Sequence, residues 1–284
     1  MGIIVAFIQH GLIGLFGAIA NLVILGAFAV LIYQMTADGA AKPLPIRHPK
    51  VELFTGLAVF VFMTFLLFLG WNLTNIPVLQ PGLERFIAVM YKAAYFLCDN
   101  GPLYWARDSI GNALFSVAIE LIPVLILFLA FGYARNMGFR LRYGKLTLAL
   151  LGITALTGLL NVQATALYHD LLPQTLVLFL IQLFINGLPE ELFYRGFLLP
   201  RLERVLKNPV NALVLSALLF NASHIPSYLA SGTGWWGAIL SVFSLICPTG
   251  LLYGYLYQRT RSIIPGVLLH TASTNILGWF FFSL

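Results

Sequence analysis

Charged side chains are scarce in this sequence. Asp, Glu, Lys and Arg make up only 9% of its 284 residues, whereas 60% are hydrophobic. A soluble domain of this length needs a charged surface, so the scarcity excludes a chain built from soluble domains. The mean hydropathy of +0.91 is instead typical of a helical membrane protein, in which backbone polar groups must pair internally.

Cysteine, zinc motifs and a basic N-terminal segment are also lacking. Cys98 and Cys247 are the only cysteines, and their spacing indicates neither a metal site nor a disulfide framework. The HExxH pattern of zinc hydrolases is absent, and no basic segment precedes the first apolar run, so we expect no cleavable signal peptide. The net charge of +6 does not indicate a nucleic-acid partner, because the basic residues are scattered among short loops.

Long apolar runs are abundant, and a membrane-spanning helix needs about 20 such residues. They predict an all-α, polytopic transmembrane bundle of about eight spans: 3–33, 53–75, 110–134, 146–168, 173–199, 209–228, 237–258 and 263–284. Basic residues gather in every second loop, which predicts cytoplasmic basic loops, both termini outside, and location in a prokaryotic cell membrane. Within residues 76–109, apolar side chains recur at helical spacing and predict an amphipathic helix on the membrane surface.

The fifth span contains the most unusual stretch. Glu190 and Glu191 are adjacent carboxylates with Arg195 four residues further on, and ionisable groups at membrane depth usually mark functional sites. Gly187 can end a helix and Pro189 can start one, so we expect a broken helix whose second half begins at the glutamates. The positive end of that half's dipole would favour ionised carboxylates.

Three further polar side chains lie inside apolar spans: His224, His270 and Asn275. Glu190 lies 17 residues before Lys207 and His224 lies 17 residues after it. If the two spans form a hairpin at Lys207, both groups are about 25 Å from the turn and level with each other. We therefore expect one acid and two imidazoles to meet near the middle of the bilayer.

This constellation predicts hydrolysis of an acyl or peptide bond. A buried carboxylate beside a neutral imidazole can activate water as a general base, and a second imidazole can donate to a developing oxyanion. A serine route through Ser223 or Ser273 is less attractive, because neither has a nucleophile-elbow context. A Zn²⁺ site formed by Glu190, His224 and His270 stays an alternative, although we expect no metal and no cofactor.

The same residues carry a family resemblance. Residues 190–195 (EELFYR) resemble an EExxxR motif, and residues 220–224 (FNASH) resemble an FxxxH motif. With the histidine of the last span, the set resembles the CPBP family, which includes CAAX proteases and bacteriocin-processing enzymes and is also called the abortive-infection family. The resemblance covers residues 170–284, so we divide the chain into N-terminal transmembrane helices with an amphipathic loop (1–169) and a CPBP-type core (170–284).

The resemblance implies an intramembrane, glutamate-dependent endopeptidase of the type II CAAX class. It makes Glu190 the base, places His224 beside the water and assigns His270 to the oxyanion hole. Glu191 and Arg195 would brace the site as an ion pair, since they are four apart on one helix face. The implied partners are membrane lipids and a peptide or lipidated-protein substrate.

One position departs from the family pattern. The fourth residue after His270 is usually Asn or Asp, but here it is Thr274, with Asn275 one residue further on. Either Thr274 donates in its place, or a local bulge brings Asn275 round, or stabilisation of the oxyanion is weakened. A non-proteolytic membrane scaffold or bacteriocin-immunity protein of the same family is therefore the alternative function. Glu120, in the third span, has no partner that the sequence identifies.

Overall fold

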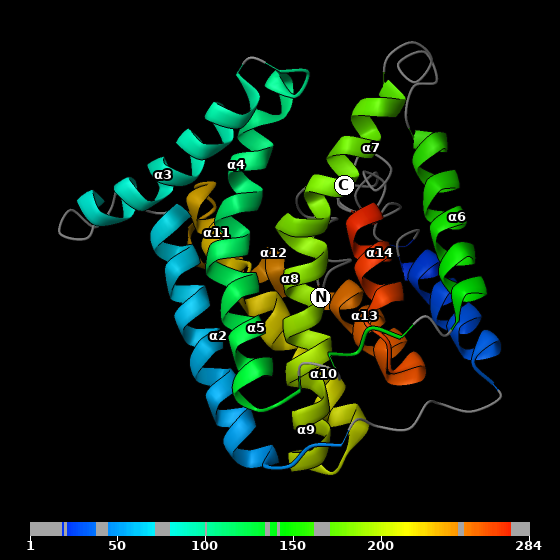
Figure 1. The fold of residues 1–284 in the computed structure, drawn as a ribbon. Helices are drawn as coiled ribbons and strands as arrows, with labels where there is room; N and C mark the ends of the chain where they lie inside the picture. Colours follow the sequence, from blue (N-terminus) through cyan, green and yellow to red (C-terminus); the bar gives the residue numbers. More distant parts are fainter. Residues whose placement is uncertain are drawn as a thin grey trace.

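The computed structural model describes residues 19, 22–37, 45–71, 80–99, 101–133, 137–140, 143–161, 171–243 and 247–273, and this part of the chain contains helices and no strand (Figure 1). Besides a helix at Leu22–Met35, its elements are α2 (Pro49–Trp71), α3 (Gln80–Cys98), η2 (Tyr104–Ala106), α4 (Arg107–Ser116), η3 (Val117–Leu121), α5 (Ile122–Ala130), α6 (Gly144–Asn161), α7 (Leu171–Gln182), η5 (Leu183–Gly187), α8 (Leu188–Glu190), η6 (Glu191–Leu198), α9 (Leu199–Leu206), α10 (Pro209–Ala222), α11 (Ile225–Ala230), α12 (Gly234–Ser241), α13 (Cys247–Thr260) and α14 (Ile264–Ser273). The predicted all-α class is confirmed.

Among these residues, four helical stretches are long and apolar enough to cross a membrane: Pro49–Gly70, Tyr104–Ala130, Leu176–Leu206 and Pro209–Ala230. Two shorter apolar helices, Leu22–Met35 and Gly144–Leu156, overlap the predicted first and fourth spans. The predicted seventh span is divided between α12 and α13, and the last span is described only as far as α14. These apolar helices indicate an integral membrane protein with four candidate spans in the described part of the chain, and a count of eight stays a prediction.

The stretch from α7 to α9 is the rod around which the other helices are arranged. The prediction that this rod breaks at Gly187 is wrong, because Gly187 has helical torsion angles (φ −58°, ψ −52°) and the chain continues through Pro189. Wide π-helical turns accommodate the proline: the N–H of Leu188 donates to the carbonyl of Leu183, five residues back. Since no helix begins at Glu190, the expected stabilisation of its charge by a helix dipole is also absent.

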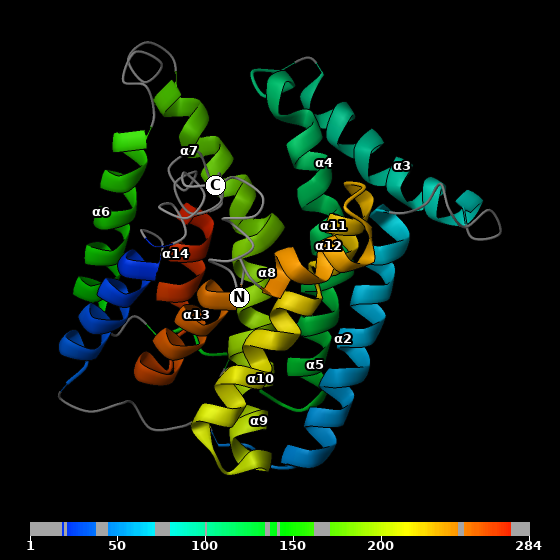
Figure 2. The ribbon, with the colours of Figure 1, turned by 180° about the vertical axis from the view of Figure 1, so that it is seen from behind.

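Helices from both halves of the chain surround this rod. In Figures 1 and 2, α4 and α5 lie on one side of it and α14 lies on the other, and the packing contacts agree. The η3 turn packs against α8, while η5 packs against α14. Consequently, residues far apart in the sequence approach the glutamates from opposite sides.

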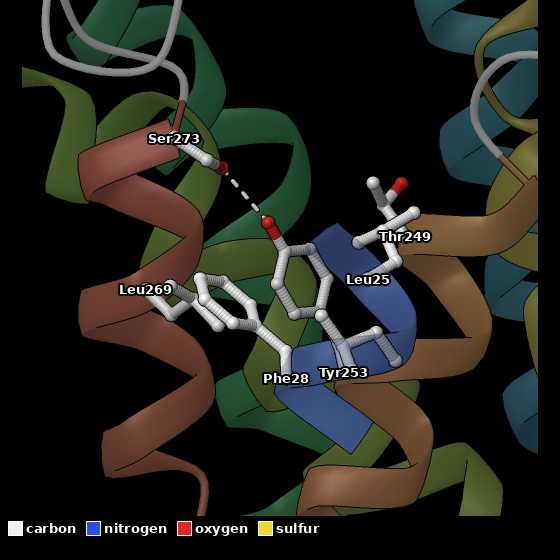
Figure 3. Close-up of a pocket in the computed structure, with 7 residues that line it drawn as sticks. Leu25, Phe28, Thr249, Tyr253, Leu269 and Ser273 are labelled. Carbon is white, nitrogen blue, oxygen red and sulfur yellow. Dashed lines mark hydrogen bonds between the residues drawn. The ribbon is translucent and has the colours of Figure 1, made fainter. Parts of the chain in front are cut away.

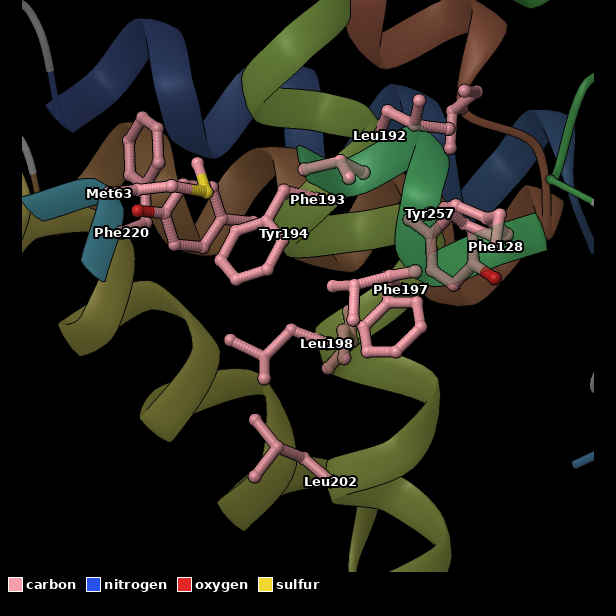
Figure 4. Packing of buried hydrophobic residues seen from close by; sticks show 14 of the residues in the cluster. Met63, Phe128, Leu192, Phe193, Tyr194, Phe197, Leu198, Leu202, Phe220 and Tyr257 are labelled. Atoms are coloured by element: carbon pink, nitrogen blue, oxygen red, sulfur yellow. The ribbon is translucent and has the colours of Figure 1, made fainter. Parts of the chain in front are cut away.

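Apolar side chains of the rod fill the main core (Figure 4). Phe193, Phe197 and Leu198 are fully buried, and the ring of Phe128 from α5 meets that of Phe197 edge to face at 5.4 Å. A second apolar cluster joins the helix Leu22–Met35 to α6, α13 and α14. Burial of aromatic rings on all sides fixes the rotation of the rod, and this rotation sets the direction in which its polar residues point.

Two predicted features of the first half are visible. The amphipathic helix expected within residues 76–109 is present as α3, which lies across the ends of α2 and α4 and projects sideways (Figure 1). Arg201 lies near the end of the fifth predicted span, where its charge would favour a helical turn that projects from the bilayer, but its side chain is buried and pairs with Glu52 of α2 at 3.0 Å. The hydroxyl of Tyr133 donates to the same carboxylate, so a satisfied polar network ties α2 to α9.

Candidate active site

Glu191 and Arg195 form a buried ion pair within η6. Their side chains are each 1% exposed, and Nη1 of Arg195 donates to Oε1 of Glu191 at 2.9 Å. Nη2 of the same guanidinium donates to the backbone carbonyl of Gly250 on α13 at 3.1 Å. A buried charge is tolerated when it is paired and hydrogen-bonded, so this arrangement holds Glu191 as a carboxylate.

His270 on α14 contacts both glutamates. Its Nδ1 lies 3.1 Å from Oε1 of Glu191, and its Nε2 lies 3.6 Å from Oε2 of Glu190. Because the Glu191 carboxylate can only accept, Nδ1 carries the proton in this contact. The predicted meeting of an acid and an imidazole from separate spans is therefore present for Glu190 and His270. Their separation of 3.6 Å is slightly longer than a hydrogen bond, so a small shift of either side chain would allow a proton to pass between them.

Glycines allow α14 to approach this closely. A Cβ on Gly187 would collide with the Oγ1 of Thr271 and lie 3.0 Å from the carbonyl oxygen of Val267. A Cβ on Gly266 would lie only 2.8 Å from Oε2 of Glu191. The absence of side chains at these two positions lets the imidazole reach the carboxylates.

Aromatic rings fix the imidazole of His270. The ring of Tyr253 stacks on it, with 4.9 Å between centroids and 24° between planes. The Tyr253 hydroxyl lies 2.8 Å from Oγ of Ser273, and a cavity of about 10 Å³ adjoins this pair beside Leu25 and Phe28 (Figure 3). Tyr253 therefore sets the orientation of His270 from the side opposite the main core.

His224 lies next to these groups but is held separately. Its Nδ1 lies 2.9 Å from the carbonyl oxygen of Phe220, which can only accept, so Nδ1 carries the proton and Nε2 keeps a lone pair. The Phe220 ring meets both imidazoles edge to face, with centroid distances of 4.9 Å to His224 and 5.8 Å to His270. One phenylalanine thus separates the two histidines.

One family model matches the segment that carries these residues. Residues 172–276 match the family model described as Rce1-like, type II CAAX prenyl endopeptidase Rce1-like. The segment is Rce1-like. The resemblance predicted from the motifs is confirmed over these residues, which are similar to the type II CAAX prenyl endopeptidase family. No curated protein and no solved structure matches the chain.

Several buried polar atoms of the Rce1-like segment have no hydrogen-bond partner among the described residues. They include Oε2 of Glu190, Oε2 of Glu191 and both side-chain polar atoms of Asn221. Buried polar atoms are rarely left unpaired unless a ligand, a water or a reaction uses them. In the described part of the chain, no group of three or more His, Cys, Asp or Glu side chains is placed to hold a metal ion, so the three-ligand zinc alternative gains no support.

Sequence reasoning identified some of these residues and missed others. Thr274 and Asn275 lie outside the described residues, so their contribution stays a prediction. Tyr253 and the carbonyl of Gly250 were missed, because a stacked ring and a backbone acceptor leave no motif. The position of Tyr253 inside an apolar span is the signal that could have indicated it.

An apolar cavity of about 470 Å³ lies on the side of the rod that faces α4 and α5, between α2, α3 and the α4–α5 stretch. It is lined by Phe62, Leu66, Leu69, Gly82, Phe86, Phe115, Ala118, Ile119 and Pro123. Ile119 directly precedes Glu120 on η3, and η3 packs against α8, which carries Glu190. The volume is in the range of small-molecule and lipid pockets.

Proposed function

We propose that this protein is an intramembrane endopeptidase of the CAAX type in which Glu190 activates a water molecule for hydrolysis of a peptide bond. The observation that carries the proposal is the unequal environment of the two glutamates. Glu191 is matched by Arg195 and by the Nδ1–H of His270. Glu190 has no guanidinium or ammonium group in contact in the described part of the chain, and its nearest basic group is Nε2 of His270 at 3.6 Å from Oε2. That Oε2 makes no hydrogen bond among the described residues and is therefore able to accept a proton.

The residues then have distinct roles. Glu190 takes a proton from water while the water oxygen attacks the carbonyl carbon of the substrate. The Nε2 lone pair of His224 accepts the second hydrogen of that water and orients it. His270, protonated beside the two carboxylates, offers its Nε2–H to the oxyanion, with Thr274 or Asn275 as further donors.

The apolar cavity supports a lipidated peptide as the substrate. It is built mainly from residues 62–123, outside the Rce1-like segment, and its lining is almost entirely hydrocarbon. A hydrocarbon chain attached to a cysteine near the end of the peptide would lie in this cavity, while the scissile bond lies by Glu190. We place the basic loops, and hence the substrate, on the cytoplasmic side of the membrane.

The test uses purified full-length protein in lipid nanodiscs and a fluorogenic peptide that ends in a prenylated cysteine and three further residues. Glu190→Gln and His224→Ala are each expected to lower kcat by about 10²–10⁴-fold, as removal of a general base does. His48→Gln and Glu84→Gln replace exposed groups and serve as controls.

Cleavage at the wild-type rate by either site variant would refute the assignment. Loss of activity in chelator, restored by Zn²⁺, would favour the zinc alternative. An unchanged cellular phenotype in both variants would favour the scaffold or immunity alternative.

A further inference from the structure

Glu120 is a buried carboxyl group that the proposed mechanism does not use. It lies in η3, is 7% exposed, and its Oε2 has no hydrogen-bond partner among the described residues. The η3 turn packs against α8, and the carboxyl groups of Glu120 and Glu190 are close enough for their charges to interact. Two glutamates therefore lie on helical turns that pack against each other, and each has an oxygen without a hydrogen-bond partner among the described residues.

The backbone on both sides of this contact is unusual. Glu120 lies within the π-helical turn η3, and Glu190 lies between the π-helical turns η5 and η6. Such turns make up well under 1% of residues in proteins and occur frequently at functional sites. Their coincidence with the two facing carboxyls indicates that the local geometry serves this pair.

The charges around the pair allow only one full negative charge to be held there. The ionisable side chains of α2 and α4, such as Glu52 and Asp108, lie near the far ends of those helices, and α5 has none. Tyr194 interacts with both glutamates, and Arg195 is already bonded to Glu191. His270 of α14, whose Nε2 lies 3.6 Å from Oε2 of Glu190, balances one negative charge on the pair when it is protonated. The other carboxyl group of the pair then has no cation of its own in an apolar site, so the two glutamates share a proton.

We propose that Glu120 is a second acid of the active site, which shares one proton with Glu190 and delivers it to the leaving nitrogen. Glu190 accepts a proton from water as the new C–O bond forms. The C–N bond then breaks as the nitrogen takes the proton of Glu120, and the proton on Glu190 passes to Glu120 to restore the pair. Protons and electrons balance with water as the only co-reactant.

This inference rests on the proposed function, and its test has two arms. In the first, Glu120→Gln, Glu120→Asp and the exposed control Glu84→Gln are assayed in nanodiscs across pH. Glu120→Gln is expected to lower kcat about 100-fold or more with KM unchanged, because a general acid contributes about 10²–10⁴-fold. The alkaline limb of the kcat profile should disappear in Glu120→Gln and return in Glu120→Asp.

The second arm needs no turnover. Infrared difference spectra across pH follow the carboxylic-acid C=O band of Glu190, which is assigned by its loss in Glu190→Gln. Replacement of Glu120 is expected to shift the pH at which this band titrates, and the Glu84→Gln control is expected to leave it unchanged.

The two arms separate failure of the proposed function from failure of the pair. A wild-type protein that cleaves nothing contradicts the proposed function, and the infrared arm still tests the shared proton. An unchanged alkaline limb in active Glu120→Gln, or an unchanged titration of Glu190, would overturn the inference. If Glu120→Gln does not fold, Glu120→Asp provides both readouts, since a shorter side chain changes the separation of the carboxyls.

Discussion

Replacement of Arg195 tests how the fold tolerates charge next to the reactive glutamate. Arg195→Met removes the guanidinium but keeps much of the apolar length of the side chain. Glu191 then keeps its contact with His270 and loses its guanidinium partner, while both positions are 1% exposed. The backbone carbonyl of Gly250 also loses its donor.

The expected cost is large. Breaking a buried ion pair by removing one partner costs about 3–5 kcal/mol, since the remaining charge stays buried. At about 1.4 kcal/mol for each tenfold change, the population of unfolded protein rises between roughly a hundredfold and a few thousandfold. Glu191→Leu leaves the guanidinium unpaired and is expected to cost a similar amount.

The double variant Glu191→Leu with Arg195→Met distinguishes pairing from packing. Removing both partners of a buried pair is often nearly neutral, so the double variant is expected to recover at least about 2 kcal/mol relative to the sum of the single variants. Its peptidase activity should not recover, because His270 lacks the acceptor for its Nδ1–H. The free energies come from reversible unfolding in mixed detergent micelles, with cleavage measured on the same samples.

The ion pair of Arg107 with Asp99 is the matched control. It has an N–O distance of 3.2 Å but its side chains are 31% and 46% exposed, so loss of the pair should change the free energy of unfolding much less than loss of the buried pair. Strictly additive effects of the Glu191 and Arg195 substitutions on the free energy of unfolding would refute the reasoning that each buried charge is stabilised by the other.

Two further variants test how His270 is positioned. Gly187→Ala is expected to lower the free energy of unfolding by about 1–3 kcal/mol and to reduce kcat, because the new methyl pushes Thr271 and hence α14 away from the rod. Gly152→Ala is the control, because nothing lies within 4 Å of its new methyl, and its thermal unfolding temperature should be unchanged or slightly raised. Tyr253→Phe keeps the stacked ring and should cost only about 0.5–1.5 kcal/mol for the lost hydrogen bond, whereas Tyr253→Leu should also lower kcat; equal kcat values in the two Tyr253 variants would contradict the stacking role.

Some of the residues that approach one another could be predicted from the sequence. An ionisable residue inside an apolar span stands out because it is costly to bury, and its depth in the membrane follows from its distance to the nearest loop. Glu190 and His270 are conspicuous as ionisable residues in apolar spans. The depth argument placed Glu190 level with His224, and the structure places His270 beside Glu190. The partner of Glu120 could not be predicted, because the contact of η3 with α8 depends on how the apolar faces of the helices interlock. Tyr253 was missed for the same reason.

The predicted break in the fifth span shows where local signals mislead. Gly187 and Pro189 favour the end of one helix and the start of another when each is considered alone. In the structure, neighbouring helices pack tightly on this stretch, and π-helical turns absorb the proline without ending the helix. Tertiary packing therefore favours the continuous helix over the broken helix that the local signals predict.

The pairing of Arg201 with Glu52 limits how this protein can be dissected. A fragment that starts at residue 170 would retain the guanidinium in its apolar surroundings, without the carboxylate that neutralises it. Supplying the missing piece as a separate polypeptide that contains α2 offers a route to reconstitution, and a chimera that borrows only the C-terminal portion should include a carboxylate donor for Arg201. The first half of the chain thus supplies a carboxylate that the second half needs to bury its own cation.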